Sequence, residues 1–195
     1  GVLGTYDDGL PSTVQEFYKL LERMEQKTVK PFIWTGDSPH YSNQILRRLF
    51  ANLGGAGLLN ANYYLDSRGE KVEIVTDFDK NGNPILDEVV ITRENGYLLR
   101  QASALYYVLE FAQKVRSNDK FIEDDGLALD HISTQEAFVN SGKTFNGNDP
   151  VAMIIDGSWW WNEANDDGIF ERFSDYPDSA QKEFKVMPLP VKYAG

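Results

Sequence analysis

The spacing of apolar residues in the first quarter of the chain predicts a helix, a strand and a second helix. Apolar side chains recur at helical spacing after Thr13, and Thr13 with Glu16 fits a capping box at the start of this helix. The segment 29–35, VKPFIWT, is typical of a short buried strand. Apolar positions at helical spacing return over 45–53, and Gly54-Gly55 is expected to end this second helix.

The middle of the chain changes to the two-residue period of β-structure. The runs 71–78 and 85–92 are joined by DKNGNP, which predicts a β-hairpin. A long amphipathic helix is expected over 98–115, and a short helix capped by Ser133 or Thr134 follows. Helices that alternate with short strands indicate an α/β layered domain.

The last third contains the most distinctive stretch, VAMIIDGSWWW at 151–161. Its apolar strand character stops at Asp156-Gly157, and three tryptophans follow a single serine. Consecutive side chains of an extended segment point to opposite faces, so three adjacent indoles cannot all be buried on one side. Either the three pack into a corner of the core, or at least one is exposed and can stack on a flat ligand. The segment 184–191, FKVMPLPV, is expected to form a strand interrupted by two prolines.

Composition narrows the class of protein. A chain of 195 residues with 42% hydrophobic residues is expected to fold as one globular domain. The 30 acidic and 19 basic residues give a net charge of −11, which argues against binding to nucleic acid or to an anionic membrane. The absence of cysteine excludes disulfides and thiol chemistry. No signal peptide is visible, and both ends of the chain fit a piece of a longer protein.

The segment DFDKNGNPILDE, residues 77–88, satisfies two patterns. Its oxygen-bearing side chains match the spacing of a calcium-binding loop, with Gly82 at the turn; they are Asp77, Asp79, Asn81 and Glu88. Such loops require flanking helices, whereas both flanks here are strand-like, and Asn-Gly between β-type runs is itself a hairpin signal. The hairpin is the preferred interpretation, and the calcium site is the alternative.

The sequence offers little that is typical of catalysis. His40 and His131 are the two histidines, and neither has a nucleophile motif beside it. Gly54 to Gly57 follow a helix and lack the lysine of a phosphate-binding loop. A glycosidase-like pair of carboxylates remains open, because acidic residues are numerous. We therefore predict a protein that is not an enzyme and that uses no cofactor.

The loop 34–41, WTGDSPHY, is the second concentration of binding chemistry. It holds Trp34, Asp37, His40 and Tyr41 at the expected C-terminal end of a strand, the edge at which open α/β sheets usually bind ligands. Sugars suit this mixture, since a ring face can stack on them and carboxylates accept hydrogen bonds from hydroxyls. The alternative is a structural turn in which Trp34 is buried.

Two separated segments together resemble the extracellular solute-binding proteins of carbohydrate ABC importers. The first is LPSTVQEFYKLL followed by KPFIWTG, and the second is QEAFVNSGKTFNGNDPVAMIIDGSWWW; the closing VMPLPV looks like the strand that crosses back between the lobes of these proteins. The second is similar to a family signature in which a small residue and a tryptophan follow a glycine. Two departures are an insertion between Gly142-Lys143 and Ala152-Met153, and an added hairpin at about 71–92.

The resemblance implies a fold and a function. It implies that residues 1–195 form a single α/β lobe of a two-lobed, periplasmic-binding-protein type II-like fold, carrying the hairpin as an insertion. The implied protein is a non-catalytic lipoprotein receptor at the extracellular face of a bacterial membrane or in the periplasm, which delivers a sugar or oligosaccharide to a membrane permease. Trp159 matches the tryptophan that stacks on sugar, and loop 34–41 supplies further contacts. Trp160 and Trp161 have no secure counterpart.

Two functions of other classes remain as alternatives. One is a calcium-stabilised extracellular adhesion or scaffold module, which rests on the 77–88 pattern. The other is a glycoside-processing enzyme, which rests on the abundance of carboxylates.

Overall fold

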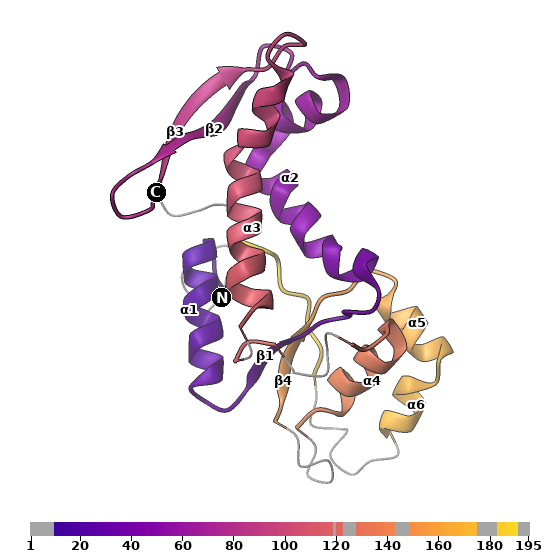
Figure 1. Cartoon of the computed structure of the whole chain (residues 1–195). Coiled ribbons are helices and arrows are strands. Elements are labelled where there is room, and N and C mark those ends of the chain that lie inside the picture. The colour runs from indigo at the N-terminus through magenta and orange to yellow at the C-terminus, as the bar shows by residue number, and fades with distance from the viewer. Residues whose placement is uncertain (1–9, 119, 123–127, 143–148, 175–182, 191–195) are drawn as a thin grey trace.

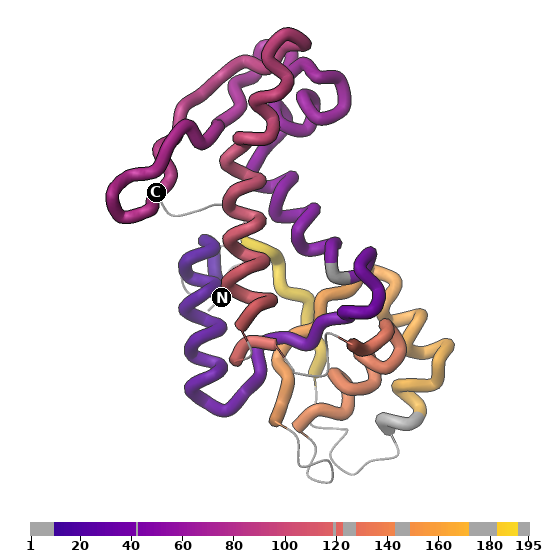
Figure 2. Tube along the Cα trace, viewed as in Figure 1, coloured from indigo at the N-terminus to yellow at the C-terminus, as the bar shows by residue number. Residues whose placement is uncertain are grey.

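The computed structural model of the chain describes residues 10–118, 120–122, 128–142, 149–174 and 183–190, and it has a mixed α/β architecture with small sheets (Figure 1). The elements, in chain order, are α1 Val14–Glu25, β1 Lys30–Ile33, α2 Pro39–Tyr64, β2 Lys71–Phe78, β3 Pro84–Val90, the 3₁₀ helix η1 Gly96–Gln101, α3 Ser103–Arg116, α4 His131–Asn140, β4 Val151–Ile154, α5 Trp160–Asp166 and α6 Ile169–Ser174. From α1 and β1 the chain runs along α2 to the β2–β3 hairpin, and it returns along α3 to the end of the molecule that holds α4, α5 and α6 (Figure 2).

The first helix begins where the capping box predicts. The Thr13 side chain accepts a hydrogen bond from the backbone N–H of Glu16, and the Glu16 carboxylate accepts one from the backbone N–H of Thr13. These bonds satisfy two of the donors that a helix start leaves open. The two bonds from backbone N–H groups, those of Ser12 and Thr13, also lower the pKa of the Glu16 carboxyl.

Strands β1 and β4 are parallel neighbours although about 120 residues separate them in sequence. Phe32 lies opposite Met153 and Ile33 opposite Ile154. On its other side β1 makes a parallel bridge from Phe32 to Ile122, so β1 is the centre of a small parallel sheet. Parallel strands end at the same edge, and the loops after β1 and β4 therefore open side by side.

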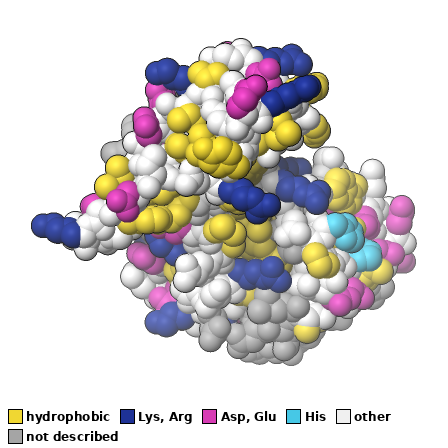
Figure 3. All heavy atoms as spheres, turned by 45° about the horizontal axis from the view of Figure 1, so that its top comes forward, with side chains coloured by type: hydrophobic (Ala, Val, Ile, Leu, Met, Phe, Trp, Pro, Cys, Tyr) yellow, Lys and Arg dark blue, Asp and Glu magenta, His cyan; other side chains and the backbone are white. Residues whose placement is uncertain are grey.

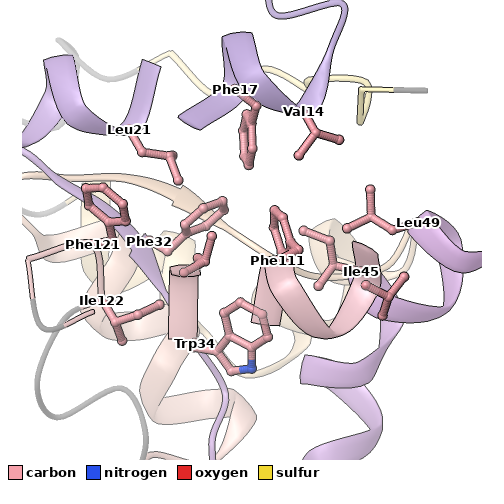
Figure 4. Packing of buried hydrophobic residues seen from close by; sticks show 12 residues of the cluster. Val14, Phe17, Leu21, Phe32, Trp34, Ile45, Leu49, Phe111, Phe121 and Ile122 are labelled. Carbon is pink, nitrogen blue, oxygen red and sulfur yellow. The ribbon is translucent and has the colours of Figure 1, made fainter. Parts of the chain in front are cut away.

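The main core lies between this sheet and the helices α1, α2 and α3 (Figure 4). Phe17 of α1 stacks on Phe111 of α3, with ring centroids 6.0 Å apart, and meets Phe32 of β1 edge-on at 5.8 Å. Burial of each such side chain contributes roughly 1.5–3 kcal/mol. The other buried members are Val14, Leu21, Trp34, Ile45, Leu49, Val108, Val115, Phe121 and Ile122.

The second helix breaks at Gly55, where φ of 61° and ψ of −169° are non-helical, so the predicted interruption at Gly54-Gly55 is confirmed. A second helical half of α2, which was not predicted, follows the break and reaches Tyr64. A residue with a side chain would be strained in that conformation, so glycine permits a bend where the sequence pattern indicated a stop. Beyond the kink, Leu58 and Ala61 pack with Val72 and Ile74 in a second core cluster.

The predicted hairpin is confirmed. Strands β2 and β3 are antiparallel, with Val72 opposite Val89 and a register shift between Val75 and Asp77. The turn is held by Asp79, whose carboxylate accepts hydrogen bonds from the backbone N–H groups of Asn81 and Asn83. One face of the hairpin packs on the end of α2, η1 and α3, and the turn extends away from the body (Figure 1).

Three predictions for the last third are wrong. Helix α4 begins at His131, and its cap is Asp130 in place of Ser133 or Thr134; the Asp130 carboxylate accepts a hydrogen bond from the Ser133 N–H at 2.8 Å. The tryptophans are not in an extended segment, because α5 begins at Trp160. Residues 183–190 form no strand; Pro188 and Pro190 there lack the N–H that a sheet ladder needs. Residues 143–148, in the expected insertion, and Val191 lie outside the described residues.

A third cluster joins α4, α5 and α6. Its buried residues are Val139, Ala164 and Ile169, and the Trp160 ring packs against them. Trp160 meets Phe170 and Phe184 edge-on at 5.6 and 5.5 Å. In the part of the chain that the structure describes, no helix is both long enough and apolar enough to cross a membrane.

Candidate ligand-binding site

The candidate site lies at the C-terminal edge of the β1–β4 pair. The chain leaves β1 at Ile33 and enters α2 at Pro39, and it leaves β4 at Ile154 and enters α5 at Trp160. The two connecting loops share this edge because the strands are parallel. Ligands of open α/β sheets bind outside the carboxyl ends of strands, so the position agrees with a binding role.

The indole of Trp159 forms an exposed platform at this edge. A side-chain carbon added at Gly157 would approach three consecutive atoms of the six-membered ring of Trp159 about equally closely. Gly157 therefore lies against a face of the indole, because an approach to the ring edge would favour one atom. Tyr41 meets the indole edge-on, with centroids 6.2 Å apart and an interplanar angle of 77°. The Trp159 side chain nevertheless remains 42% exposed. Its position is held by neighbours, while ring surface is left open to stack on a ligand.

Tyr41, near the start of α2, has two histidine neighbours, His40 of α2 and His131 of α4. The His131 ring stacks on the Tyr41 ring with centroids 5.2 Å apart and planes within 9°, and the His40 ring is 4.6 Å away on a tilt of 52°. Figure 3 shows the two histidines in cyan beside acidic side chains in magenta. The rings of Trp159, Tyr41, His40 and His131, from three separate segments of the chain, therefore form one cluster.

Two carboxylates lie beneath the rings and are joined by one amide. The Gln135 Nε2 group donates to Glu163 Oε2 at 2.6 Å and to Asp156 Oδ2 at 3.1 Å. The Tyr41 hydroxyl donates to Glu163 Oε1 at 2.7 Å, and His131 Nε2 is 3.8 Å from the same oxygen. This network links α2, α4, the end of β4 and α5.

Burial changes the acidity of two groups in the network. It raises the pKa of Tyr41 to about 12, and the hydrogen bond to Glu163 acts in the same direction. The phenol therefore stays protonated and donates to Glu163 throughout the neutral range. Burial also raises the pKa of Asp156, although the hydrogen bonds from the Gly157 N–H and the Gln135 side chain oppose it.

A hollow of about 440 Å³ opens above this network. Its walls come from α4 and α5, and they combine one indole with imidazole, amide and carboxylate groups. The lining residues are His131, Ile132, Trp159, Asn162, Glu163, Asp166 and Asp167.

A larger hollow, of about 510 Å³, lies between the two halves of α2 and helix α3. Most of its lining is apolar, and no carboxylate lines it; the residues are Asn43, Leu46, Arg47, Phe50, Leu59, Asn62, Tyr63, Leu105 and Val108. We place the site at the smaller hollow, because there an exposed ring and several hydrogen-bonding groups converge, which is what orients a polar ligand.

The structure brings together three of the five residues predicted to bind ligand. Tyr41 contacts the rings of both His40 and Trp159, although Trp159 lies far from the other two in sequence; of the three, Trp159 lines the hollow. Trp34 is elsewhere: it is 1% exposed in the main core, so its ring offers no surface to a ligand. The Asp37 side chain is exposed, and its carboxylate makes no hydrogen bond to the described residues of the site; its backbone N–H donates to the Leu129 carbonyl.

The sequence did not indicate four members of the network, Gln135, Asp156, Glu163 and His131. His131 was considered only as a catalytic base, and Asp156 only as the end of a strand. Glu163 lies four residues after Trp159, one helical turn along α5, and this spacing could have connected it with the tryptophan. Gln135 carries no local signal, because its role depends on the packing of α4 against α5.

The calcium interpretation of residues 77–88 does not agree with the hairpin geometry. Glu88 lies opposite Glu73 in the hairpin. Glu73 is four residues from Asp77 along β2, and at the rise of a strand this separation is about 13 Å, so Glu88 is far from Asp77. The Glu88 carboxylate pairs with Lys71 Nζ at 2.7 Å. Among the described residues, which include the whole hairpin, no group of three or more acidic, histidine or cysteine side chains is arranged to hold a metal ion.

Comparisons of the chain with protein-family models, with curated proteins and with solved structures find no match. The function proposed below therefore depends on the site and on the sequence resemblance.

Proposed function

We propose that this chain is the carbohydrate-binding part of an extracellular receptor that serves an ABC importer, and that it acts without catalysis. One observation carries the proposal: the Trp159 indole is packed on Gly157 at the carboxyl edge of a parallel strand pair and remains 42% exposed beside hydrogen-bonding groups. A flat exposed ring next to polar groups suits a sugar, whose ring face is apolar and whose edge carries hydroxyls.

The hydrogen-bonding groups favour hydroxyl ligands. Glu163, Asp166 and Asp167 offer carboxylate oxygens at the hollow, and Asn162 offers both a donor and an acceptor there. A hydroxyl can donate to a carboxylate and accept from an amide at once. The pairing of one stacking ring with several such groups agrees with a saccharide better than with a wholly apolar ligand.

The positions of the carboxylates favour binding over glycoside hydrolysis. Hydrolysis requires one carboxyl group to be a proton donor and the other to be ionised, with the substrate between them. Here one Gln135 Nε2 group donates to both Asp156 and Glu163. Of these two residues, Glu163 lines the hollow and Asp156 does not, so the pair does not flank a common substrate position.

The proposal can be tested by comparing two exposed tryptophans that lie two residues apart in sequence. Trp159 and Trp161 are 42% and 58% exposed, so alanine at either removes an exposed indole at comparable cost to folding. The unmodified chain, Trp159→Ala and Trp161→Ala would each be titrated with a panel of neutral mono- and oligosaccharides. Binding would be followed by the NMR signals of the indole N–H groups, of which the chain has 4.

We expect a saccharide to shift the Trp159 signal, and we expect Trp159→Ala to weaken its binding by about tenfold or more. Trp161→Ala should bind as the unmodified chain does. Equal losses in the two variants, or no shift with any saccharide at millimolar concentration, would contradict the proposal. Release of a chromophore from aryl glycosides, lost in Glu163→Gln, would support the glycoside-processing alternative.

The receptor role adds an expectation about the lobe. A ligand held between two lobes is shielded on both sides, whereas one lobe offers half of the contacts. The chain alone should therefore bind more weakly than a longer protein that also supplies a second lobe. Nanomolar binding by the chain alone would contradict the two-lobed arrangement while leaving saccharide binding intact.

A further inference from the structure

Two hydrogen-bond donors of the network beneath the hollow are already used within the protein. The Tyr41 hydroxyl donates to Glu163, and the Gln135 amide nitrogen donates to both Glu163 and Asp156. The assignment of the Gln135 amide follows from its neighbours, because the opposite orientation would place a carbonyl oxygen against two carboxylates. What the network still offers to a ligand is mainly acceptors.

One of these acceptors is buried without a partner. Gln135 is 0% exposed, and its Oε1 atom has no hydrogen-bond partner among the described residues. An unpaired buried acceptor costs free energy, and such atoms are characteristic of sites completed by a ligand. A ligand that reaches the Asp156–Glu163 pair with an N–H or O–H group arrives next to this amide.

The charge of the site is strongly negative. Three carboxylates line the hollow itself, those of Glu163, Asp166 and Asp167, and Asp156 lies beneath it. Neither lysine nor arginine is among the lining residues, and His131 is the one lining side chain that can become a cation. The net charge of −11 for the whole chain adds to this field. A neutral ligand gains little from such an accumulation of like charge, whereas a cation is attracted by it.

The rings add a second attraction for a cation. The Trp159 indole and the Tyr41 phenol stand nearly perpendicular, 6.2 Å apart, at the border of the hollow. Indole is the most favourable aromatic partner for an ammonium group, and Trp159 retains exposed surface. An ammonium group is also a pure donor, with three N–H bonds and no acceptor, so it matches a lining that is rich in carboxylate acceptors.

We propose that the ligand of this site is a saccharide that carries a protonated amine, an amino sugar or an oligosaccharide of amino sugars. The proposal rests on the carbohydrate function proposed above and specifies its substrate class. The sugar ring stacks on Trp159, while the ammonium group lies against the carboxylates that line the hollow, those of Glu163, Asp166 and Asp167. The site discriminates against sugars that carry a carboxylate.

The test uses disaccharides with the same linkage and ring configuration and different charge. They are the β-1,4-linked dimers of glucosamine, of N-acetylglucosamine and of glucose, together with a uronic acid dimer. Each would be titrated into the 195-residue chain at slightly acidic pH, where the free amine is protonated, and followed by the Trp159 indole signal. A simple alkylammonium salt controls for charge without a sugar ring.

We expect the glucosamine dimer to bind at least about tenfold more tightly than the two neutral dimers, with no detectable binding of the uronic acid dimer. Added salt should reduce this preference, because it screens the charges of a partly exposed site. Glu163→Gln should reduce the preference for the amine and affect the neutral dimers less. Asp166→Asn, at an exposed lining residue, is a second variant that leaves the buried network intact and should act in the same direction.

Asp87→Asn is the matched control, since it removes the same charge from strand β3, outside the lining of the hollow, and should leave the preference unchanged. Equal affinity for the charged and neutral dimers would overturn the amine inference and leave the carbohydrate function standing. Tightest binding of the uronic acid dimer would overturn it in the same way. Binding of the alkylammonium salt as tightly as the glucosamine dimer, or no binding of any sugar, would overturn both proposals.

Discussion

The ends of β1 and β4 lie side by side, and a tryptophan follows each strand, yet the two tryptophans have opposite environments. Trp34 directly follows β1 and is 1% exposed in the main core. Trp159 comes five residues after the end of β4 and is 42% exposed. Since the side chain is the same, its hydrophobicity cannot account for the difference.

The path of the chain after each strand accounts for it. Trp34 continues the direction of β1, and its ring meets Phe32 edge-on at 6.4 Å (Figure 4). After β4 the chain passes through Asp156-Gly157 and turns at Ser158-Trp159, where the Trp160 N–H donates to the Gly157 carbonyl. Trp159 takes a helical conformation as the residue that precedes α5. Gly157, having no side chain, leaves the space that one face of the indole occupies. A tryptophan at the carboxyl edge is therefore structural or available to a ligand according to the turn that precedes it.

The largest effect that this comparison predicts is on stability. Trp34→Ala should lower the free energy of unfolding by about 3–5 kcal/mol, because it leaves a large cavity in the main core. Trp159→Ala, which removes an exposed ring, should cost about 1 kcal/mol or less. Urea denaturation followed by circular dichroism would measure both.

Trp34→Phe is the milder control. It keeps an aromatic ring and removes the indole Nε1 group, which is buried without a hydrogen-bond partner among the described residues. Its cost should fall well below that of alanine. A cost for Trp34→Ala no larger than that for Trp159→Ala would show that Trp34 is not the core residue described above.

An intermediate effect is expected at the glycine beneath the platform. Alanine at Gly157 would place its Cβ in the space of the Trp159 ring, so the ring must move, at a cost of about 1 kcal/mol in stability. The ring is partly exposed and can move outward, which makes the loss of saccharide binding the larger consequence. The Trp159 indole signal and a saccharide titration would report the two changes.

Gly96→Ala is the matched control for that change. A Cβ at Gly96 meets Leu65 at 3.5 Å, an ordinary contact, so both stability and binding should stay close to those of the unmodified chain. If Gly157→Ala binds saccharide with unchanged affinity, the position of Trp159 on Gly157 is not part of the site.

The smallest predicted effect concerns Asp156 and depends on pH. Burial raises the pKa of this carboxyl above its ordinary value of 3.8, so the folded protein holds the proton more tightly than the unfolded chain does. Its contribution to stability is complete below that value and is lost as the pH rises through the folded pKa. At neutral pH the ionised group therefore costs stability.

Asp156→Asn removes this cost, and its single side-chain oxygen can accept one of the two hydrogen bonds, from the Gln135 amide or from the Gly157 N–H, that Asp156 accepts at separate oxygens. We expect the variant to be more stable at neutral pH by about 1 kcal/mol or less. The difference should shrink as the pH is lowered toward 4. Thermal melts at several pH values would measure it, and a variant less stable at neutral pH would show that the hydrogen bonds to the carboxylate outweigh its burial.

The elements that the sequence predicted well have local causes. The capping box of Thr13 and Glu16 begins α1, and the Asn-Gly turn joins β2 to β3, because each depends on neighbouring residues. The break of α2 at Gly54-Gly55 was predicted, whereas the helical half that follows it was not, since glycine permits a stop or a kink equally well. The packing of Leu58 and Ala61 decides for the kink, and that contact is with the distant hairpin.

The residues of the candidate site likewise divide into those that the sequence indicated and those that only the fold brings together. Trp159, Tyr41 and His40 could be proposed from two short segments, because aromatic and polar residues gather after a strand in each. The sequence could not show that Trp34 turns into the core, since both alternatives suit an apolar residue at a strand end. Nor could it show Gln135 between Asp156 and Glu163, because α4 and α5 bring these residues together.

The sequence by itself determined the helices and strands of the first half, the hairpin, and the composition of the two loops that follow β1 and β4. Those features depend on hydrophobic period, capping and turn residues, which act over a few positions of the chain. The tertiary structure alone decided which tryptophan is exposed and which acids share a donor. The parallel pairing of β1 with β4 sets those contacts, and it joins segments about 120 residues apart, whose meeting no local pattern records.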